Sequence, residues 1–240
     1  MQHLILTRLA VGRPSDEWLK YRMAIFEKFC APCLAAQSNR NFKWLLAITH
    51  QTPGWFIGRV GQWLAPCNAV LVYAGENQEV FINWAPLVTK YLTDGRLLTS
   101  RLDSDDMYHR DFVDTVQQAA EKSENDVILD FPTGYQLRYE DLKCRRVTQL
   151  KPTHFISRIE NSRQTVFGCG DHTRVHNKFK VLKDRTNPMW VEICHQRNIC
   201  VKFCDHGRIF PWSDIQGQFI GPKELSRAEY SGSRLVRRIR

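Results

Sequence analysis

The strongest constraint on the fold is an alternation of apolar, β-prone segments with segments of helical spacing along the first part of the chain. Strands are predicted over residues 3–9, 42–49, 69–73, 96–102 and 127–131, and helices over residues 16–36, 57–64, 86–92 and 112–122. This alternation is typical of an open α/β sheet whose strands run mostly parallel. We therefore predict a Rossmann-like α/β fold with a mostly parallel central sheet and helices on both faces. In such sheets ligands bind at the carboxyl ends of the strands.

The pattern changes from residue 134 onward. Residues 135–139 alternate as in a hairpin strand, and the glycine-punctuated residues 165–170 precede a stretch rich in His and Lys. We predict an α+β half that caps the first. Because 240 residues suit one domain of this class better than two, a single domain is expected. In the first helix, Ser15 or Asp16 is the expected N-cap, and Pro32 is expected to break or shift the helix near its end.

Composition excludes two classes of protein. With 43% hydrophobic and 25% charged residues, the chain belongs with folded proteins and not with disordered ones. No apolar run approaches the roughly 20 residues that cross a bilayer. The N-terminus lacks the basic leading region of a signal peptide and is predicted to be the first strand, so a cytoplasmic location is expected. The eight cysteines are then expected to be thiols, and their spacing completes no four-ligand zinc set.

The net charge of +9 favours anionic partners, which include nucleotide phosphates, nucleic acid and an acidic membrane face. The charge alone does not choose among them. Part of the excess lies in the tail, residues 234–240, where a solvated chain end is the expected state and a phosphate or lipid contact is the alternative.

An acidic run, Asp103-Ser104-Asp105-Asp106, follows directly after the predicted strand 96–102. Carboxylates this close repel one another unless a cation or hydrogen-bond donors neutralise them. Asp103 and Asp105 are two residues apart, so on an extended strand end they would point the same way, while Asp106 turns out of the strand. Such a set suits Mg²⁺ or Mn²⁺. The alternative is an acidic loop that caps the helix beginning near Asp111.

Several segments carry a resemblance to a known family. Leu102-Asp103-Ser104-Asp105-Asp106 resembles the Asp-x-Asp motif of GT-A fold glycosyltransferases. Leu6-Thr7-Arg8 and residues 26–38, 42–46, 100–106 and 188–198 resemble the putative rhamnosyltransferase family. The resemblance implies a GT-A-like domain in which the carboxylates bridge through Mn²⁺ or Mg²⁺ to the diphosphate of a nucleotide sugar. It also implies that residues 1–133 bind the nucleotide sugar and that residues 134–240, with the basic tail, form the acceptor side.

The resemblance also assigns expected roles to individual residues. The donor-binding residues are Thr7, Arg8, His50, Arg101, Asp103, Ser104 and Asp105. His50 departs from the family pattern, because many related enzymes have an Asp at that place beside the base. The expected metal ligands are Asp103, Asp105 and Asp106, with His195 or His206 as an additional ligand and His172 as a competitor. Lys178, Lys180 and Arg197 are further candidates for phosphate contacts, and ordinary surface charge is the alternative for each.

Asp106 and Asp171 are the candidate catalytic residues. Asp171 lies in Gly168-Cys169-Gly170-Asp171-His172, where glycines predict a loop, and related transferases use a carboxylate from this region as the base. A turn-stabilising Asp is the alternative.

The predicted activity is metal-dependent transfer of a sugar, rhamnose by the resemblance, from a nucleotide diphosphate to a hydroxyl acceptor on a glycan. A glycosyltransferase acting on modified bases of DNA is one alternative, because its acceptor groove needs positive charge. The other is a non-catalytic nucleic-acid-binding module, which the charge and the tryptophans Trp55, Trp63, Trp190 and Trp212 favour but which leaves the acidic run unexplained.

Overall fold

A computed structural model of the chain describes residues 1–12, 14–75, 82–92, 95–161, 164–198, 202–203 and 205–220. The predictions about Cys200, Cys204 and the basic tail 234–240 lie outside the described residues. The six cysteines that the structure describes are free and buried.

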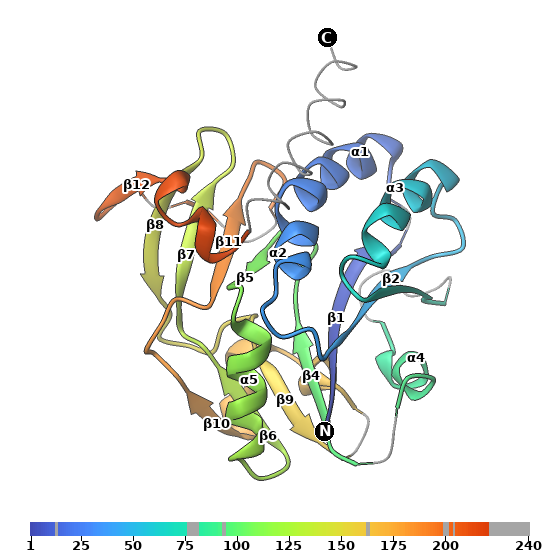
Figure 1. The fold of residues 1–240 in the computed structure, drawn as a ribbon, viewed down its shortest axis with the longest axis vertical. Helices are drawn as coiled ribbons and strands as arrows, with labels where there is room; N and C mark the ends of the chain where they lie inside the picture. Colours follow the sequence, from blue (N-terminus) through green and yellow to red (C-terminus); the bar gives the residue numbers. More distant parts are fainter. Residues whose placement is uncertain are drawn as a thin grey trace.

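In the described part of the chain, the larger sheet has seven strands in the order β10-β6-β9-β4-β1-β2-β3 (Figure 1). These strands are β1 (Gln2–Ala10), β2 (Lys43–Ile48), β3 (Ala69–Tyr73), β4 (Leu97–Arg101), β6 (Val127–Asp130), β9 (Ser157–Glu160) and β10 (Lys180–Lys183). All neighbouring pairs are parallel except those of β9, which is antiparallel to both β4 and β6. The predicted α/β fold with a mostly parallel sheet is confirmed. The five strands expected in the first part are all present, because buried parallel strands are continuous apolar runs.

Helices cover both faces of this sheet, as predicted. They are α1 (Asp16–Ile25), α2 (Ala31–Ala35), α3 (Gly54–Leu64), α4 (Trp84–Thr89) and α5 (Phe112–Glu121), with 3-10 turns at Val166–Cys169, His172–Asn177, Trp212–Asp214 and Gln216–Gln218. One core cluster joins buried residues of α1, α2, α3 and α5 to one face of the sheet. A second cluster joins α4 and the first two 3-10 turns to the other face.

The predicted first helix is continuous but changes pitch. Ser15 caps α1 by accepting a hydrogen bond from the Trp18 N–H, so the first of the two expected caps is confirmed. A π-helical turn, Phe26–Cys30, then separates α1 from α2, with Pro32 at the start of α2. Proline has no N–H to give to the carbonyl four residues earlier, and the wider turn accommodates that loss. The helix is thus shifted ahead of Pro32, as its position predicted.

A smaller sheet has the order β12-β8-β7-β11-β5 in the described residues. Its strands are β5 (Met107–Tyr108), β7 (Thr133–Arg138), β8 (Lys143–Thr148), β11 (Trp190–Cys194) and β12 (Ile209–Pro211). β7 and β8 form the expected hairpin. Because β9 and β10 follow residue 133 yet belong to the larger sheet, the two sheets interleave along the chain. The division into a nucleotide half and an acceptor half stays a prediction.

Among the described residues, every helix is too short or too polar to cross a membrane.

Buried His3 makes stability depend on pH. Its Nε2 lies 2.8 Å from Ser100 Oγ and its Nδ1 lies 3.3 Å from Gln117 Nε2. Burial lowers the pKa of His3 from 6.5 to about 3. Between pH 3 and pH 6.5, His3 is therefore protonated in the unfolded chain and neutral in the folded chain. The contribution of His3 to stability is therefore complete above pH 6.5 and declines as the pH falls towards 3.

Replacing His3 with Gln is expected to remove part of this acid sensitivity. Between pH 7 and pH 4.5, urea unfolding of the wild type should lose about 2 to 3 kcal/mol more than that of His3→Gln. The exposed His176→Gln serves as the matched control and should follow the wild type. Equal losses in all three proteins would show that His3 titrates normally.

Candidate active site

The acidic run lies where the strand order of the larger sheet reverses. The chain passes from β1 to β2 and β3 on one side, and then returns to place β4 on the other side of β1. The crevice at such a switch point is the usual ligand site of an open α/β sheet. Thr7, near the end of β1, connects β1 to both of its neighbours. Its Oγ1 donates to the carbonyl of Leu102, which follows β4, at 2.6 Å, and accepts from Trp44 Nε1 of β2 at 2.8 Å. Thr7 is fully buried in this role.

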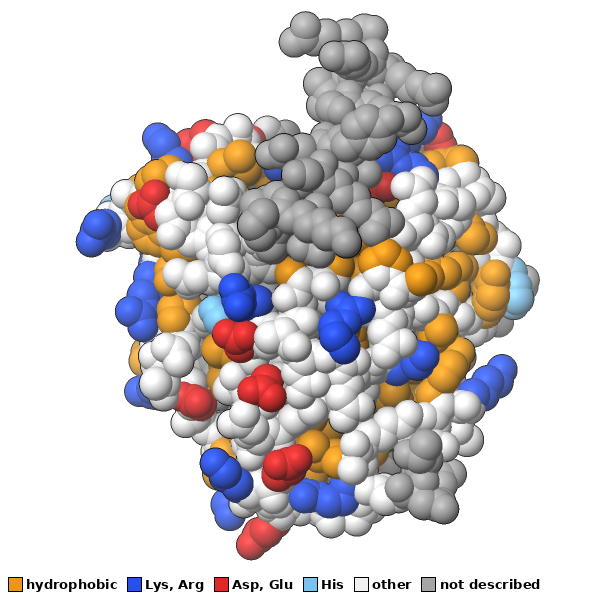
Figure 2. Space-filling model, in the orientation of Figure 1, with side chains coloured by type: hydrophobic (Ala, Val, Ile, Leu, Met, Phe, Trp, Pro, Cys, Tyr) orange, Lys and Arg blue, Asp and Glu red, His pale blue; other side chains and the backbone are white. Residues whose placement is uncertain are grey.

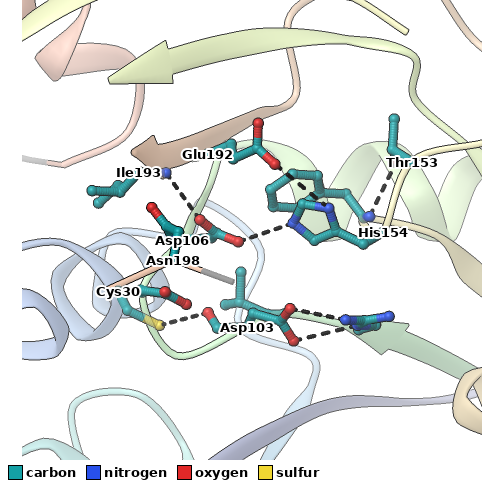
Figure 3. Close-up of polar contacts among 12 residues, drawn as sticks. Cys30, Asp103, Asp106, Thr153, His154, Glu192, Ile193 and Asn198 are labelled. Atoms are coloured by element: carbon teal, nitrogen blue, oxygen red, sulfur yellow. Dashed lines mark hydrogen bonds and ion pairs between the residues drawn. The ribbon is translucent and has the colours of Figure 1, made fainter. Parts of the chain in front are cut away.

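The acidic run is a turn and not an extended strand end. β4 ends at Arg101, and the Asp106 N–H donates to the Asp103 carbonyl at 3.1 Å before β5 begins. The expectation of an extended strand end at Asp103 to Asp105 was therefore wrong, because β4 ends two residues before Asp103. The turn instead brings Asp103 and Asp106 together (Figure 3).

Asp103, Asp106 and His154 form the cluster that could hold a metal ion. One ligand atom from each lies within 4.8 Å of the others. His154 Nε2 lies 3.0 Å from Asp106 Oδ2, and the Ile193 N–H donates to Asp106 Oδ1 at 3.0 Å. Figure 3 shows Asp106 directed at the His154 ring. We call these three residues the carboxylate–histidine cluster.

The two acids of the cluster have pKa values shifted in opposite directions. Burial raises the pKa of Asp106 to about 7, despite the hydrogen bond from His154 that opposes the shift. Burial acts the same way on Asp103, but the charges of Arg101, His154 and Arg8 outweigh it and hold the pKa of that carboxyl well below its ordinary value. Burial alone would lower the pKa of His154, yet Asp106 and Asp103 raise it. Asp103 is thus held ionised, while Asp106 and His154 share a proton.

Two arginines border Asp103. Arg101 Nη2 lies 2.9 Å from Asp103 Oδ2, and Arg8 Nη2 lies 3.7 Å from Asp103 Oδ1. Both guanidinium groups also approach the ring of Phe167, at 5.4 Å for Arg101 and 5.5 Å for Arg8. The structure therefore places two of the predicted donor-binding residues, Arg8 and Arg101, beside a candidate metal ligand.

Asp105 belongs to a second, separate pair. Its Oδ2 lies 2.9 Å from His195 Nε2 and also forms an ion pair with Arg22 of α1. Asn198 positions His195 by accepting a hydrogen bond from its backbone N–H. The structure thus brings together two of the predicted metal ligands, Asp105 and His195, but it gives Asp105 an arginine partner and keeps it out of the carboxylate–histidine cluster.

The remaining predicted residues lie around this centre or away from it. Ser104 is buried within the acidic turn. His172 is near the cluster, because its ring centroid lies 6.0 Å from that of His154, and burial with the charges of Arg101 and His154 lowers its pKa to about 4. The neighbouring Asp171 is exposed and accepts hydrogen bonds from Thr173 N and Oγ1, which is the turn-stabilising alternative. Its role as a base stays a prediction.

Five further predicted residues lie on the surface. His50 is exposed and stacks on Tyr73, with ring centroids 4.6 Å apart. His206 is exposed and is not part of the cluster. Lys178 is exposed, and Lys180 lies 3.7 Å from Glu124. Arg197 pairs with Glu17 and lies over the ring of Tyr21, 4.8 Å from its centroid.

His154 is the residue that sequence reasoning missed. It lies far along the chain from the acidic run and carries no motif of its own. Because β9 is antiparallel to β4, the residues that precede β9 reach the same edge of the sheet as the residues that follow β4. An antiparallel partner predicted for β4 would have been the signal, but the sequence alternation indicated a mostly parallel sheet and did not say which strand would run antiparallel.

Buried contacts hold His154 in place. Asp130 Oδ1 accepts hydrogen bonds from Thr153 N at 3.0 Å and Thr153 Oγ1 at 2.9 Å. On the other side, the Phe155 ring stacks on Trp190, with centroids 4.6 Å apart and planes within 10°. Trp190 Nε1 in turn donates to the Phe131 carbonyl at 2.6 Å. The histidine is therefore fixed by both of its chain neighbours.

A family model described as "Putative rhamnosyl transferase" matches residues 9–204. This range contains the acidic turn, His154 and His195. No curated protein sequence matches the chain.

Solved structures share the fold. The structure of S. aureus TarS 1-349 in complex with UDP-GlcNAc has a TM-score of 0.52 at 10% identity, over 82% of this chain and 60% of that one. Another structure of S. aureus TarS has a TM-score of 0.50 at 11% identity, over 80% of this chain and 37% of that one. This chain thus spans 60% or less of these matched proteins. At such identities the likeness concerns the fold, and it confirms the predicted GT-A-like architecture.

Proposed function

As a member of the putative rhamnosyl transferase family, this chain is a glycosyltransferase, and we propose that it transfers a sugar from a nucleotide diphosphate to a hydroxyl of a glycan with the help of Mn²⁺ or Mg²⁺. The sugar we propose is rhamnose, by the family's description. The observation that carries the proposal is the carboxylate–histidine cluster at the sheet's switch point, with two arginines beside it.

The residues present fit a divalent ion. Two carboxylates and an imidazole are ligands that Mn²⁺ accepts, and carboxylates suit Mg²⁺ as well. Burial raises the pKa of Asp106 to about 7, and the nearby acids Asp105 and Glu192 add to this shift; a bound cation would favour the ionised carboxylate against both effects. Asp103, Asp106 and His154 would hold the ion, which would neutralise the charge that develops on the leaving diphosphate.

Charge balance favours this cluster over the pair of Asp105 and His195. Glu192 Oε1 lies 3.9 Å from His154 Nδ1, so once Asp106 and His154 have released their protons three carboxylates, Asp103, Asp106 and Glu192, stand against Arg101 and Arg8. Asp105 is a single carboxylate already neutralised by Arg22. A bound cation has a more favourable electrostatic energy at a site where negative charge is in excess.

The surrounding residues take complementary roles in the proposal. Arg101 and Arg8 would turn from Asp103 to the phosphate oxygens of the donor, because a guanidinium binds phosphate as well as carboxylate. The exposed stack of His50 on Tyr73 lies at the carboxyl ends of β2 and β3 and would receive the nucleotide base. Asp171 is the proposed base for the acceptor hydroxyl. The comparisons offer no support for nucleic acid as a partner.

A thermal-shift screen of nucleoside diphosphates, with and without Mn²⁺, tests this proposal. A ligand at a hundred times its Kd stabilises the folded state by about 2.7 kcal/mol. For a chain of this size that corresponds to a rise in Tm of roughly 5 to 10 °C. We expect this rise for at least one diphosphate in the presence of Mn²⁺ and a smaller one in its absence. If no diphosphate shifts Tm under either condition, the proposed donor site is wrong.

A further inference from the structure

The ring of Phe167 lies beside both of the arginines that border Asp103. Arg8 and Arg101 come from two different strands, β1 and β4. Their guanidinium carbons nevertheless both lie over this one ring, 5.5 Å and 5.4 Å from its centroid. An aromatic face attracts a guanidinium group within about 6 Å. Phe167 is therefore a second contact, besides Asp103, that the two side chains share.

The position of Phe167 is fixed from two sides. Trp84, the first residue of α4, is buried and stacks on the Phe167 ring, with centroids 5.3 Å apart and planes within 18°. The backbone just before the ring is tied to β4, because the Val166 N–H donates to Thr99 Oγ1 at 2.8 Å. The ring thus has little freedom to leave the arginines.

The turn that carries Phe167 contains a strained residue. Thr165 has a φ of 62° and a ψ of 170°, a backbone conformation that residues with a side chain rarely adopt. Thr165 is fully buried, and its carbonyl accepts hydrogen bonds from Arg158 Nη1 at 3.3 Å and from the Gly168 N–H at 3.1 Å. Such strain persists where the surroundings enforce it, and it is concentrated at functional sites. The turn is therefore held in place although its own backbone disfavours the conformation.

The two arginines remain accessible to a ligand. The Arg8 side chain is 29% exposed and the Arg101 side chain is 17% exposed, and Phe167 is only partly buried. A carboxylate partner neutralises a guanidinium group, whereas an aromatic ring orients it and leaves its charge in place. The contact with Phe167 therefore keeps both cations available to an anion.

The overall charge does not supply such a site by itself. Over the face of the molecule that Figure 2 shows, basic and acidic side chains of the described residues are interspersed. The net charge of +9 is thus not gathered into one patch on this face. An anion has to be recognised by individual cations, and their orientation then decides the affinity.

We propose that Phe167 is a positioning residue for the diphosphate of the donor. When Asp103 binds a metal ion, the ring keeps Arg8 and Arg101 directed at the phosphates. This inference rests on the proposed function, which supplies the diphosphate and the ion. Ordering a flexible side chain only on binding weakens affinity by roughly two- to twelve-fold. Phe167 orders two such side chains before the ligand arrives.

Binding of inorganic pyrophosphate to the full chain, measured by calorimetry without a metal ion, tests the proposal. Phe167→Leu keeps an apolar side chain but has no aromatic face, and it should weaken binding about ten-fold. Phe167→Tyr keeps the face and should restore the affinity of the wild type. In an Arg8→Gln background, Phe167→Leu should weaken binding only about three-fold, because one guanidinium group remains to be ordered.

Phe42→Leu is the matched control. Phe42 also lies under an arginine, with the guanidinium carbon of Arg40 5.5 Å from its ring centroid, but it precedes β2 at the opposite end of that strand from the site. This variant should bind pyrophosphate as the wild type does. An equal loss in Phe42→Leu would overturn the proposal, because general loosening of the fold would then explain the effect.

Three further outcomes would also overturn the positioning role. They are unchanged binding by Phe167→Leu, a loss in Phe167→Tyr as large as that in Phe167→Leu, and no binding of pyrophosphate by the wild type. The proposed function would survive each of them. It fails when no nucleoside diphosphate stabilises the wild type even with Mn²⁺, which is a separate measurement.

Discussion

Asp103→Asn is expected to lower metal-dependent donor turnover by about a hundred-fold or more. Loss of a residue that merely supports a metal ligand typically costs ten- to a hundred-fold in affinity or activity, and a ligand itself costs at least as much. The amide oxygen of Asn can still accept a hydrogen bond from Arg101, so the fold should be retained. Hydrolysis of the donor that the thermal-shift screen identifies, measured across Mn²⁺ concentrations, gives the turnover and the apparent affinity for the ion.

Two comparisons make this result specific. Asp184→Asn changes an exposed carboxylate far along the chain from the acidic turn and should leave turnover unchanged. His154→Ala should weaken Mn²⁺ binding about ten- to a hundred-fold, whereas His195→Ala should retain it. Each histidine contacts one carboxylate of the same turn, so the two variants are matched. The reverse outcome, with Mn²⁺ binding lost only in His195→Ala, would move the metal to Asp105.

Gly134→Ala is expected to destabilise the fold by about 3 kcal/mol or more, lowering Tm by roughly 6 to 12 °C. A Cβ at this position of β7 would lie 2.2 Å from Trp190 Cδ2, well inside van der Waals contact. The indole cannot withdraw easily, because one face stacks on Phe155 and its Nε1 donates to the Phe131 carbonyl. Thermal and urea unfolding would measure the loss.

The same substitution at Gly61 in α3 is the matched control. A Cβ there meets no atom within 4 Å, and Ala is favoured over Gly in a helix by about 0.5 to 1 kcal/mol. Gly61→Ala should therefore be neutral or stabilising. The Gly134 variant should also lose Mn²⁺ affinity at temperatures where it remains folded, since displacing Trp190 moves Phe155 and with it His154. A Gly134→Ala protein as stable as the wild type would show that the Trp190 ring is loosely packed.

The sequence predicted the fold better than the site, for a physical reason that Asp105 illustrates. Periodicity reports on burial, and the five strands, four of them buried along nearly their whole length, left five apolar runs. Which way a carboxylate points in the turn after a strand depends on how the chain closes that turn, and the hydrogen bond from Asp106 to Asp103 carries no sequence signal. Asp105, expected to be one of three metal ligands, consequently contacts Arg22 and His195.

His154 shows a second reason why the site was harder to predict than the fold. A ligand that comes from a distant segment is found only when strand pairing is known, and the pairing of β9 with β4 and β6 is antiparallel in an otherwise parallel sheet. The context of the acidic run was nevertheless informative. A carboxylate cluster after a buried strand predicted the correct edge of the correct sheet, and the family resemblance supplied the fold before any pairing was known.

The position of β9 also has a consequence for how the protein is made. β1 to β3 can pair as soon as they leave the ribosome, but β4 and β6 are joined only when β9 inserts between them. Contacts between segments so distant in sequence form late, because a long loop must close first. His154 lies just ahead of β9 and arrives with it. A nascent chain that has not yet inserted β9 therefore lacks a complete cluster, and metal binding would report that β9 is in place.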